Sequence, residues 1–564
     1  MPLLAMEARI LLRIQQKTRF SDCQETKEAC MKKYFSVFLV VILLFLQINV
    51  TVPVQAELVS ANAEIRVGLT SMYSAREEIK LYNSKLGYGY CIGNIYLQEV
   101  VLESATGFTF TPENGYFVSE KTAYASYQAA KKAADAYNSM GIEAYPGSTY
   151  QCSWRVYFGN RSKYAEAEQL LENISLITEK ANFEVLHGNN YRVRLEGSFG
   201  SLLIDVDERY AYPQFRPLTA NENGVYCVSM GSRDYRGRME IGRYGKGTLT
   251  AVNVVPLEEY LYGVVPAEMP STWHEEALKA QAVCSRSYAL VKAGYGGSSN
   301  AKKGYKIVDT VSSQVYKGCL YESQKVNRAV DATKGEMVCY NNKVVAAYFF
   351  STSGGHTENS MDVWAVDLPY LQGVPDPYES NASREVWETV VRKQELTALL
   401  AKQEMDIGAV SELVPTSYSK YGRIRALRVF GAERSVTLQG TTIRTLLNLN
   451  STKFKIVEKG DVPDKVTVLS AEGTSERRIS DMYIASADDV AKASAELSQY
   501  IVQGAEDLWN YPASAPDGAE ELLLAGMGFG HGVGMSQYGA KGMAEAGYSY
   551  KEIIEYYYTG AYVR

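Results

Sequence analysis

The chain is organised around the stretch Val265-Pro266-Ala267-Glu268-Met269-Pro270, which places one carboxylate among apolar residues and two prolines. Apolar surroundings disfavour the ionised form of a carboxyl group, and a carboxyl that stays protonated near neutral pH can act as a general acid. Glu268 is therefore a candidate catalytic acid. The alternative is a strand-end carboxylate that accepts a backbone hydrogen bond and helps to cap the next helix.

A long helix is predicted directly after this stretch. It begins at the capping box Thr272-Trp273-His274-Glu275 and ends at Gly294. One side of it should face the core, because apolar side chains recur at helical spacing at Ala277, Ala280, Cys284, Tyr288 and Val291.

A different face of this helix carries Lys279 and Arg286, two turns apart. Together they form a candidate cationic rail for an anionic substrate. The alternative for Lys279 is an ordinary surface pair with Glu275, one turn earlier. Arg286 has no carboxylate four residues before or after it, which favours a tertiary or ligand partner.

The N-terminal region has the pattern of a secretory signal peptide that starts at Met31. Two lysines follow Met31, an apolar run covers residues 37–46, and small residues precede a predicted cleavage before Glu57. The residues before Met31 would be an upstream extension, so residues 1–56 are excluded from the mature fold. The protein is expected outside the cytoplasm, secreted or associated with the cell wall. The alternative is an uncleaved membrane anchor over residues 34–50.

Length and composition limit the remaining classes. With 564 residues the chain should hold about two to four domains. Hydrophobic residues make up 46% and charged residues 22%, as in ordinary globular proteins, and the formal net charge of −6 argues against a nucleic-acid partner.

The cysteines form no C-x-x-C pair, which argues against a zinc ribbon or a thioredoxin-type site. Buried free thiols are the default expectation, and Cys319 with Cys339 is the first pair to test for a disulfide.

The predicted fold class is α+β, with three regions after the signal segment. Residues 57–111 alternate as short strands. Residues 112–188 have the pattern of strand, helix, strand and then again strand, helix, strand, a small βαββαβ sandwich. This region resembles a SPOR domain, which implies binding to peptidoglycan glycan strands that lack stem peptides; the alternative is a ferredoxin-like insertion. Residues 191–564 form a strand-rich catalytic region around the long helix, with an insertion at about 460–524.

Two glycine-containing loops are candidate ligand contacts. The first follows a predicted strand and contributes Ser351, Ser353, Gly354 and Gly355. Its competing interpretation is a plain Gly-Gly turn. The second, residues 528–540, places glycines at alternate positions around His531, so that backbone amides and the imidazole can approach a ligand; a structural histidine is the alternative. The glycine spacing is not that of a dinucleotide-binding loop.

Four motifs over about residues 240–564 resemble, in this order, those of the stage II sporulation protein D and LytB family. They cover residues 264–270, 276–288, 351–359 and 531–540. The resemblance implies lytic cleavage of peptidoglycan glycan strands already stripped of stem peptides, with Glu268 as the catalytic acid. It implies substrate contacts for Lys279, Gln281, Arg286, Tyr288, Ser351, Ser353, Gly354, Gly355, His531, Gln537 and Tyr538.

The chemistry that the resemblance implies needs one carboxyl group. Glu268 would protonate the glycosidic oxygen that leaves N-acetylmuramic acid, and would then accept the proton of the muramic C6 hydroxyl as that hydroxyl closes on the anomeric carbon. Stripped strands expose lactyl carboxylates, which are partners of the right sign for Lys279 and Arg286. Trp364 and tyrosines would stack on sugar faces.

The sequence departs from part of this family at a metal site. Some members bind a metal through a His-Cys pair just before the Gln-Val-Tyr motif and a cysteine shortly upstream, whereas these positions here read Ser312-Ser313 and Ile307. No metal is therefore predicted, and no cofactor is expected. The alternative function is a non-catalytic wall-binding protein that recruits or stimulates a cell-wall amidase, as the LytB branch suggests. Membrane contact is expected only if the signal segment stays uncleaved.

Overall fold

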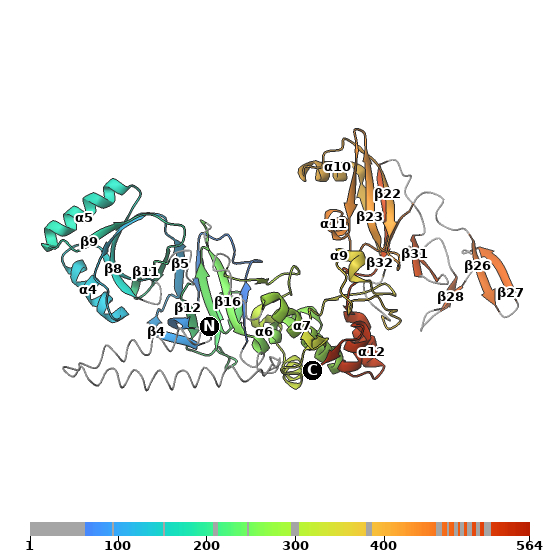
Figure 1. Cartoon of the computed structure of the whole chain (residues 1–564), viewed down its shortest axis with the longest axis horizontal. Helices are drawn as coiled ribbons and strands as arrows, with labels where there is room; N and C mark the ends of the chain where they lie inside the picture. The colour runs from blue at the N-terminus through green and yellow to red at the C-terminus, as the bar shows by residue number, and fades with distance from the viewer. Residues whose placement is uncertain are drawn as a thin grey trace, which may run out of the picture. The chain divides into compact units, whose positions relative to one another are not determined.

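A computed structural model describes residues 63–92, 95–149, 153–206, 212–244, 247–294, 304–379, 386–457 and 520–564, and the backbone of short strands between residues 458 and 519. The described chain is a mixture of α-helices and β-strands (Figure 1), as the sequence predicts. The predicted signal segment lies outside the described residues. None of the described helices is long and apolar enough to cross a membrane.

A seven-stranded sheet joins the predicted strand-rich lead segment to the region after residue 191. Its strand order is β17-β1-β16-β15-β12-β3-β4. The strands are β1 (Glu64–Gly68), β3 (Lys85–Ile92), β4 (Ile95–Glu103), β12 (Gln214–Pro217), β15 (Arg238–Gly242), β16 (Thr250–Pro256) and β17 (Ile307–Val308). Ile65 and Val67 of β1 are buried, while Arg66 between them forms an ion pair with Glu240 of β15 at 2.8 Å. The alternating pattern of β1 therefore matches a strand paired inside a sheet.

The βαββαβ order predicted for residues 112–188 is present. It consists of β6 (Tyr116–Glu120), α4 (Tyr127–Ser139), β7 (Ala144–Ser148), β8 (Trp154–Arg161), α5 (Tyr164–Thr178) and β9 (Phe183–Leu186). These four strands lie in the order β7-β8-β6-β9, and both helices pack on them (Figure 1). The sheet continues past β7 through β11 (Gly200–Ile204), β10 (Val193–Gly197), β5 (Phe108–Pro112) and β2 (Ile79–Leu81), because the edge of β7 pairs with β11. The fold order is confirmed, and the resemblance to a SPOR domain stays a prediction.

The stretch around Glu268 is helical rather than the end of a strand. Strand β16 leads directly into α6 (Leu257–Glu268), and Glu268 is the last residue of that helix. The next helix, α7 (Glu275–Ala293), ends at Gly294 with φ +64°, as predicted. Its start differs from the prediction: the cap is His274, whose Nδ1 accepts a hydrogen bond from the N–H of Glu276 at 3.3 Å, and the capping box at Thr272 is not formed.

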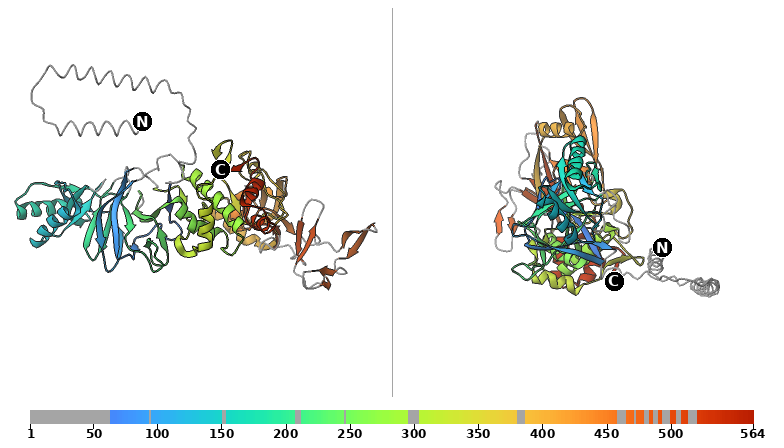
Figure 2. Two further views of the ribbon diagram at one scale, coloured as in Figure 1. Left: turned by 90° about the horizontal axis from the view of Figure 1, so that it is seen from below. Right: turned by 90° about the vertical axis from the view of Figure 1, so that its left-hand side faces the viewer.

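Helix α7 is enclosed by other helices. It contacts α6, α8 (Gln324–Ala332), α12 (Gln537–Glu545) and α13 (Tyr550–Tyr557), and the last two come from the far end of the sequence (Figure 2). Four of the five residues predicted to face the core are buried, whereas Val291 is 41% exposed. The burial extends all round the helix and includes Gln281, Ser285, Arg286 and Ser287. An all-round buried helix leaves few of its polar side chains available to a ligand.

The strands after residue 348 include one, β20 (Phe349–Phe350), that lines the site and others that form two small sheets. Strand β20 pairs in parallel with β33 (Met535–Ser536), which brings the two glycine-containing loops together. A three-stranded sheet contains β21 (Val386–Arg392), β32 (Glu521–Met527) and β25 (Phe454–Val457), and another contains β22 (Val410–Tyr418), β23 (Ile424–Gly431) and β24 (Ser435–Gln439). The short helices α9 (Ser360–Trp364), α10 (Lys393–Lys402) and α11 (Thr441–Leu446) lie in the same region. Most of the predicted insertion at 460–524 lies outside the described side chains.

Two features of the molecule bear on its chemistry. The Sγ atoms of Cys227 and Cys319 are 3.2 Å apart, so Cys227 and not Cys339 is the neighbour of Cys319 in the structure.

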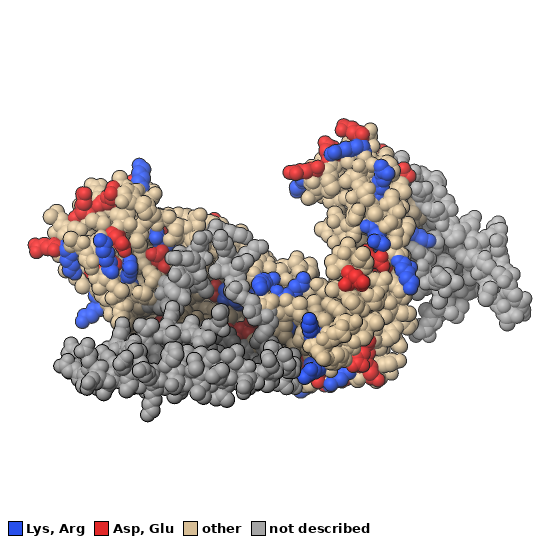
Figure 3. Space-filling view, viewed as in Figure 1, with Lys and Arg blue, Asp and Glu red and all other residues tan. Residues whose placement is uncertain are grey.

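On the face shown in Figure 3, acidic and basic side chains are interspersed and neither sign dominates. A polyanion would therefore find no continuous basic surface on that face.

Candidate active site

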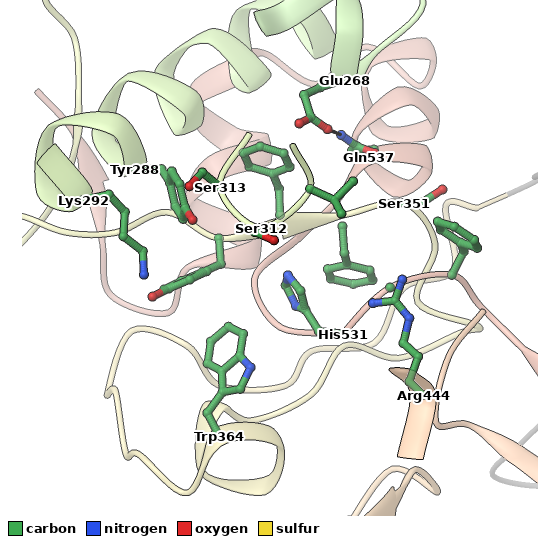
Figure 4. Close-up of a pocket in the computed structure, with 16 residues that line it drawn as sticks. Glu268, Tyr288, Lys292, Ser312, Ser313, Ser351, Trp364, Arg444, His531 and Gln537 are labelled. Atoms are coloured by element: carbon green, nitrogen blue, oxygen red, sulfur yellow. Dashed lines mark hydrogen bonds between the residues drawn. The ribbon is translucent and has the colours of Figure 1, made fainter. Parts of the chain in front are cut away.

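A cleft of about 480 Å³ opens beside Glu268 (Figure 4), a volume within the range of ligand pockets, roughly 300–1,000 Å³. Helices α6, α7, α9, α11 and α12, strand β20 and the two glycine-containing loops contribute to it. The lining residues are Glu268, Tyr288, Lys292, Val311, Ser312, Ser313, Tyr348, Phe349, Phe350, Ser351, Trp364, Arg444, Phe529, Gly530, His531 and Gln537.

Glu268 is the one carboxylate among these lining residues. Its Oε1 accepts a hydrogen bond from the backbone N–H of Val315 at 2.8 Å, and its Oε2 accepts one from Nε2 of Gln537 at 3.5 Å. Burial raises the pKa of Glu268 to about 6, although both hydrogen bonds act in the opposite direction because they favour the carboxylate. The group can therefore carry a proton at mildly acidic pH and still be held in a fixed position.

A buried polar network fixes the partners of Glu268. Gln537 donates from Nε2 to Oε1 of Gln281 at 3.4 Å, and Gln281 donates to Oγ of Ser285 at 2.9 Å. Gln314, next to Val315, donates to the carbonyl of Ser285 at 3.3 Å. Gln281 is fully buried and does not line the cleft. Its role in the structure is to hold the side chain of Gln537 in position.

Aromatic side chains form much of the wall. Tyr348 and Trp364 have ring centroids 4.6 Å apart, and Trp364 lies 5.1 Å from the imidazole of His531. Flat apolar rings of this kind can stack on the faces of sugar rings. The sequence predicts Tyr288 and Trp364 here but misses Tyr348, Phe350 and Phe529. The signal for Tyr348 and Phe350 was the aromatic run just before Ser351, and the signal for Phe529 was its place in the glycine-containing loop of His531.

His531 lines the cleft as a neutral imidazole. Burial and the nearby guanidinium groups of Arg423 and Arg444 lower its pKa to about 3. Its Nδ1 accepts a hydrogen bond from the N–H of Val533 at 3.1 Å, which leaves the proton on Nε2. A group with this pKa is not an acid or base near neutral pH, so His531 shapes the wall.

The alternate glycines beside His531 serve packing within the chain. Gly530 has φ +116°, and a Cβ there would lie 2.7 Å from Cβ of Phe350. Gly532 has φ +84°, and a Cβ there would lie 2.6 Å from the guanidinium of Arg423. Only glycine fits both requirements. At these two glycines the loop therefore approaches its own chain closely, and Gly530 and His531 of the same loop also line the cleft.

The other glycine loop is also directed inward. Ser351 lines the cleft, but the backbone N–H groups of Ser353 and Gly354 donate to the buried carboxylate of Glu379. The N–H of Gly355 donates to Oγ of Ser353 at 3.1 Å. These amides are satisfied inside the protein, so the structure does not place Ser353, Gly354 or Gly355 against a ligand in the cleft.

The predicted rail of Lys279 and Arg286 is not formed. Nζ of Lys279 pairs with Glu276 at 2.8 Å and with Glu275 at 3.0 Å. Arg286 is fully buried, and its guanidinium binds both carboxylate oxygens of Glu258, at 3.0 and 2.7 Å. Both cations already have acidic partners and neither lines the cleft.

Other cations take their place in the cleft. Lys292, in the last turn of α7, and Arg444, in α11, are lining residues that the sequence did not single out. Tyr538 does not line the cleft; it packs on Trp273 with ring centroids 4.8 Å apart. Within the described residues, no three His, Cys, Asp or Glu side chains are arranged to hold a metal.

The sequence profile of the family described as "Stage II sporulation protein" matches residues 245–340, a range that contains α6, α7 and Val315. The chain is 31% identical to Stage II sporulation protein D of Bacillus subtilis (strain 168), over 56% of this chain and 76% of the relative. It is 30% identical to a protein of the same organism named Amidase enhancer, over 53% of this chain and 39% of that relative. An uncharacterised protein of Brachyspira hyodysenteriae is 29% identical, over 71% of this chain and 94% of the relative.

The similarity to Stage II sporulation protein D covers most of that protein, and the profile match includes α6, which carries Glu268, together with α7 and Val315. The chain therefore belongs to the stage II sporulation protein D family.

Proposed function

We propose that the protein is a lytic transglycosylase that cleaves peptidoglycan glycan strands lacking stem peptides. The observation that carries this proposal is a cleft with aromatic walls and a single carboxyl group whose pKa is about 6. A glycosidase that uses water or a covalent intermediate needs two carboxyl groups. A lytic reaction needs one, because the nucleophile is a hydroxyl group of the substrate.

In the proposed reaction, protonated Glu268 donates its proton to the oxygen of the bond between N-acetylmuramic acid and N-acetylglucosamine. The bond from that oxygen to the muramic anomeric carbon breaks, and the muramic C6 hydroxyl forms a new bond to the same carbon. The hydroxyl proton passes to Glu268, which returns to its starting form. No water is consumed, and the product ends in 1,6-anhydro-N-acetylmuramic acid.

The proposal extends to location and binding. The βαββαβ region would bind the same glycan polymer, as its resemblance to a SPOR domain implies, and would raise the local concentration of strands near the cleft. Action on the cell wall would require the protein to lie outside the cytoplasm, in sporulation or in wall remodelling. Contact with a membrane would require that residues 34–50 are retained.

The alternative is a non-catalytic wall-binding protein that stimulates a cell-wall amidase. One observation favours it: a relative that matches 53% of this chain carries the name Amidase enhancer. Both functions require export and glycan binding, so only the products distinguish them.

The deciding experiment incubates purified residues 57–564, a compact unit, with glycan strands that an amidase has stripped of stem peptides. We expect soluble products that end in 1,6-anhydro-N-acetylmuramic acid, identified by mass because they are one water lighter than hydrolysis products. Intact peptidoglycan under the same conditions is the matched control and should release much less. If stripped strands stay intact while a purified amidase is accelerated, the amidase-stimulating function is correct.

The pH dependence of the reaction provides a separate prediction. Only the protonated form of Glu268 can donate, and burial raises its pKa to about 6. The value of kcat/KM should therefore be flat below about pH 6 and fall about tenfold per pH unit above it, since about a tenth of the free enzyme carries the proton at pH 7. Initial rates on stripped glycan between pH 4.5 and 8.5 measure this. A rate that rises over that range would assign activity to the ionised carboxylate and contradict the mechanism.

A further inference from the structure

Lys292 and Arg444 differ from the other cations near the cleft because neither forms an ion pair with any described residue. Nζ of Lys292 lies 5.6 Å from the ring centroids of both Tyr288 and Tyr348. Arg444 lies over the ring of Phe529 at 5.6 Å. Both charges are therefore placed on the aromatic wall of the cleft.

Arg444 keeps most of its donors available. Its Nε donates to the carbonyl of Leu449 at 3.3 Å, and its two terminal nitrogens form no hydrogen bond within the described residues. Burial lowers the pKa of Arg444, and no acidic group offsets that effect. A partly buried cation without an anion costs free energy, so the site is completed best by an anionic ligand.

Other cations near the cleft have a structural role, because each is paired with an acidic side chain of the protein. Arg286 binds Glu258, Lys279 binds Glu276, and Arg425 pairs with Asp362 at 3.1 Å. The chain as a whole has a formal net charge of −6, and the face in Figure 3 mixes both signs. Two cations and one carboxyl in the cleft are therefore a local departure from the rest of the protein.

We propose that Lys292 and Arg444 bind carboxylate groups of the glycan strand, and that these contacts select strands without stem peptides. This inference rests on the proposed function. In a stripped strand each muramic residue carries a free lactyl carboxylate, whereas in an intact strand the same carbon is part of a neutral amide. Arginine can bind a carboxylate through two parallel hydrogen bonds, and lysine adds a compact charge.

The geometry is suited to an extended ligand. Figure 4 shows Lys292 and Arg444 on either side of His531, with Lys292 toward Tyr288 and Trp364. We expect the two cations to contact lactyl carboxylates of different muramic residues of one strand. Lys292 also lies in the last turn of α7, where a cation is favourable in any case, so Arg444 provides the stronger structural evidence.

The test measures binding and does not depend on turnover. Glu268→Gln is expected to slow any cleavage by about three orders of magnitude. In that background Lys292→Gln and Arg444→Gln are each compared with Lys279→Gln, whose side chain lies outside the cleft. The probe is a stripped glycan oligosaccharide, either with its carboxylates intact or with them reduced to primary alcohols. Titration calorimetry gives the dissociation constants, and melting temperatures check folding. If Arg444→Gln does not fold, Arg444→Lys, which keeps the charge, replaces it in the binding comparison.

We expect each cleft substitution to weaken binding of the carboxylate form roughly tenfold, and Lys279→Gln to leave it unchanged. On the reduced oligosaccharide, the protein with Glu268→Gln alone should bind more weakly than on the carboxylate form. Adding a cleft substitution should then change its dissociation constant little. Equal losses on both oligosaccharides, or no loss on either, would overturn the inference. Because binding is measured without cleavage, this result is independent of whether the native protein forms anhydro products.

Discussion

Glu268→Gln is expected to lower kcat on stripped glycan by about three orders of magnitude or more, since a positioned general acid contributes about 10²–10⁴-fold and Glu268 serves as both acid and base. Glutamine keeps the size of the side chain, and its carbonyl oxygen can still accept the N–H of Val315. It has no acidic proton to donate to the leaving oxygen. Initial rates of anhydro-product release, measured with saturating substrate, give the effect.

A matched control for this substitution is Glu275→Gln, at the start of α7. The side chain of Glu275 is 53% exposed and pairs with Lys279, away from the cleft. It should keep the native rate and melting temperature. Equal product release from Glu268→Gln and the native protein would remove Glu268 from the mechanism.

Arg286→Met is expected to lower the free energy of unfolding by about 3–5 kcal/mol, the usual cost of removing one partner of a buried ion pair. The side chain of Arg286 has no exposed surface, and Glu258 is 14% exposed. Its Nη1 also donates to the carbonyl of Glu336 at 3.0 Å. Methionine fills the space but leaves the carboxylate of Glu258 without its partner and removes a donor from Glu336.

The control is Lys279→Met on the same helix, which breaks pairs with partly exposed Glu275 and Glu276 and should cost less than about 1 kcal/mol. Urea unfolding followed by tryptophan fluorescence gives the shift in midpoint for both variants. If Arg286→Met remained as stable as the native protein but lost glycan binding, the substrate-binding interpretation of Arg286 would be restored.

The sequence predicts local features of this fold well. The end of α7 at Gly294, the βαββαβ order and the apolar surroundings of Glu268 all follow from short-range patterns. Such patterns depend on propensity, capping and periodicity, which neighbouring residues determine.

The sequence could not identify the partners of charged side chains. Arg286 has no acid within one helical turn, yet Glu258 on α6, 28 residues earlier, meets it once the two helices pack. Helical periodicity predicts one buried face, whereas α7 is covered by four helices and leaves Arg286 inside. Local patterns also could not show that Arg444 lines the cleft, because tertiary packing brings α11 there.

Glycine patterns were ambiguous for a related physical reason. Alternate glycines show that something must come close to the backbone, and a ligand and another part of the chain impose the same requirement. At Gly530 and Gly532 the close neighbours are Phe350 and Arg423. The pattern correctly predicted a close approach to the backbone but could not show which group makes that approach.

The hydrogen bond between Glu268 and Gln537 joins residues that are 269 positions apart. During synthesis, Glu268 emerges from the ribosome long before α12, which carries Gln537, and before the loop that carries His531. The acid therefore lacks one of its hydrogen-bond donors and part of its wall until the later segment has been made and docked. A site built in this order stays incomplete in every shorter nascent chain, so the proposed activity would begin only after that segment has folded into place.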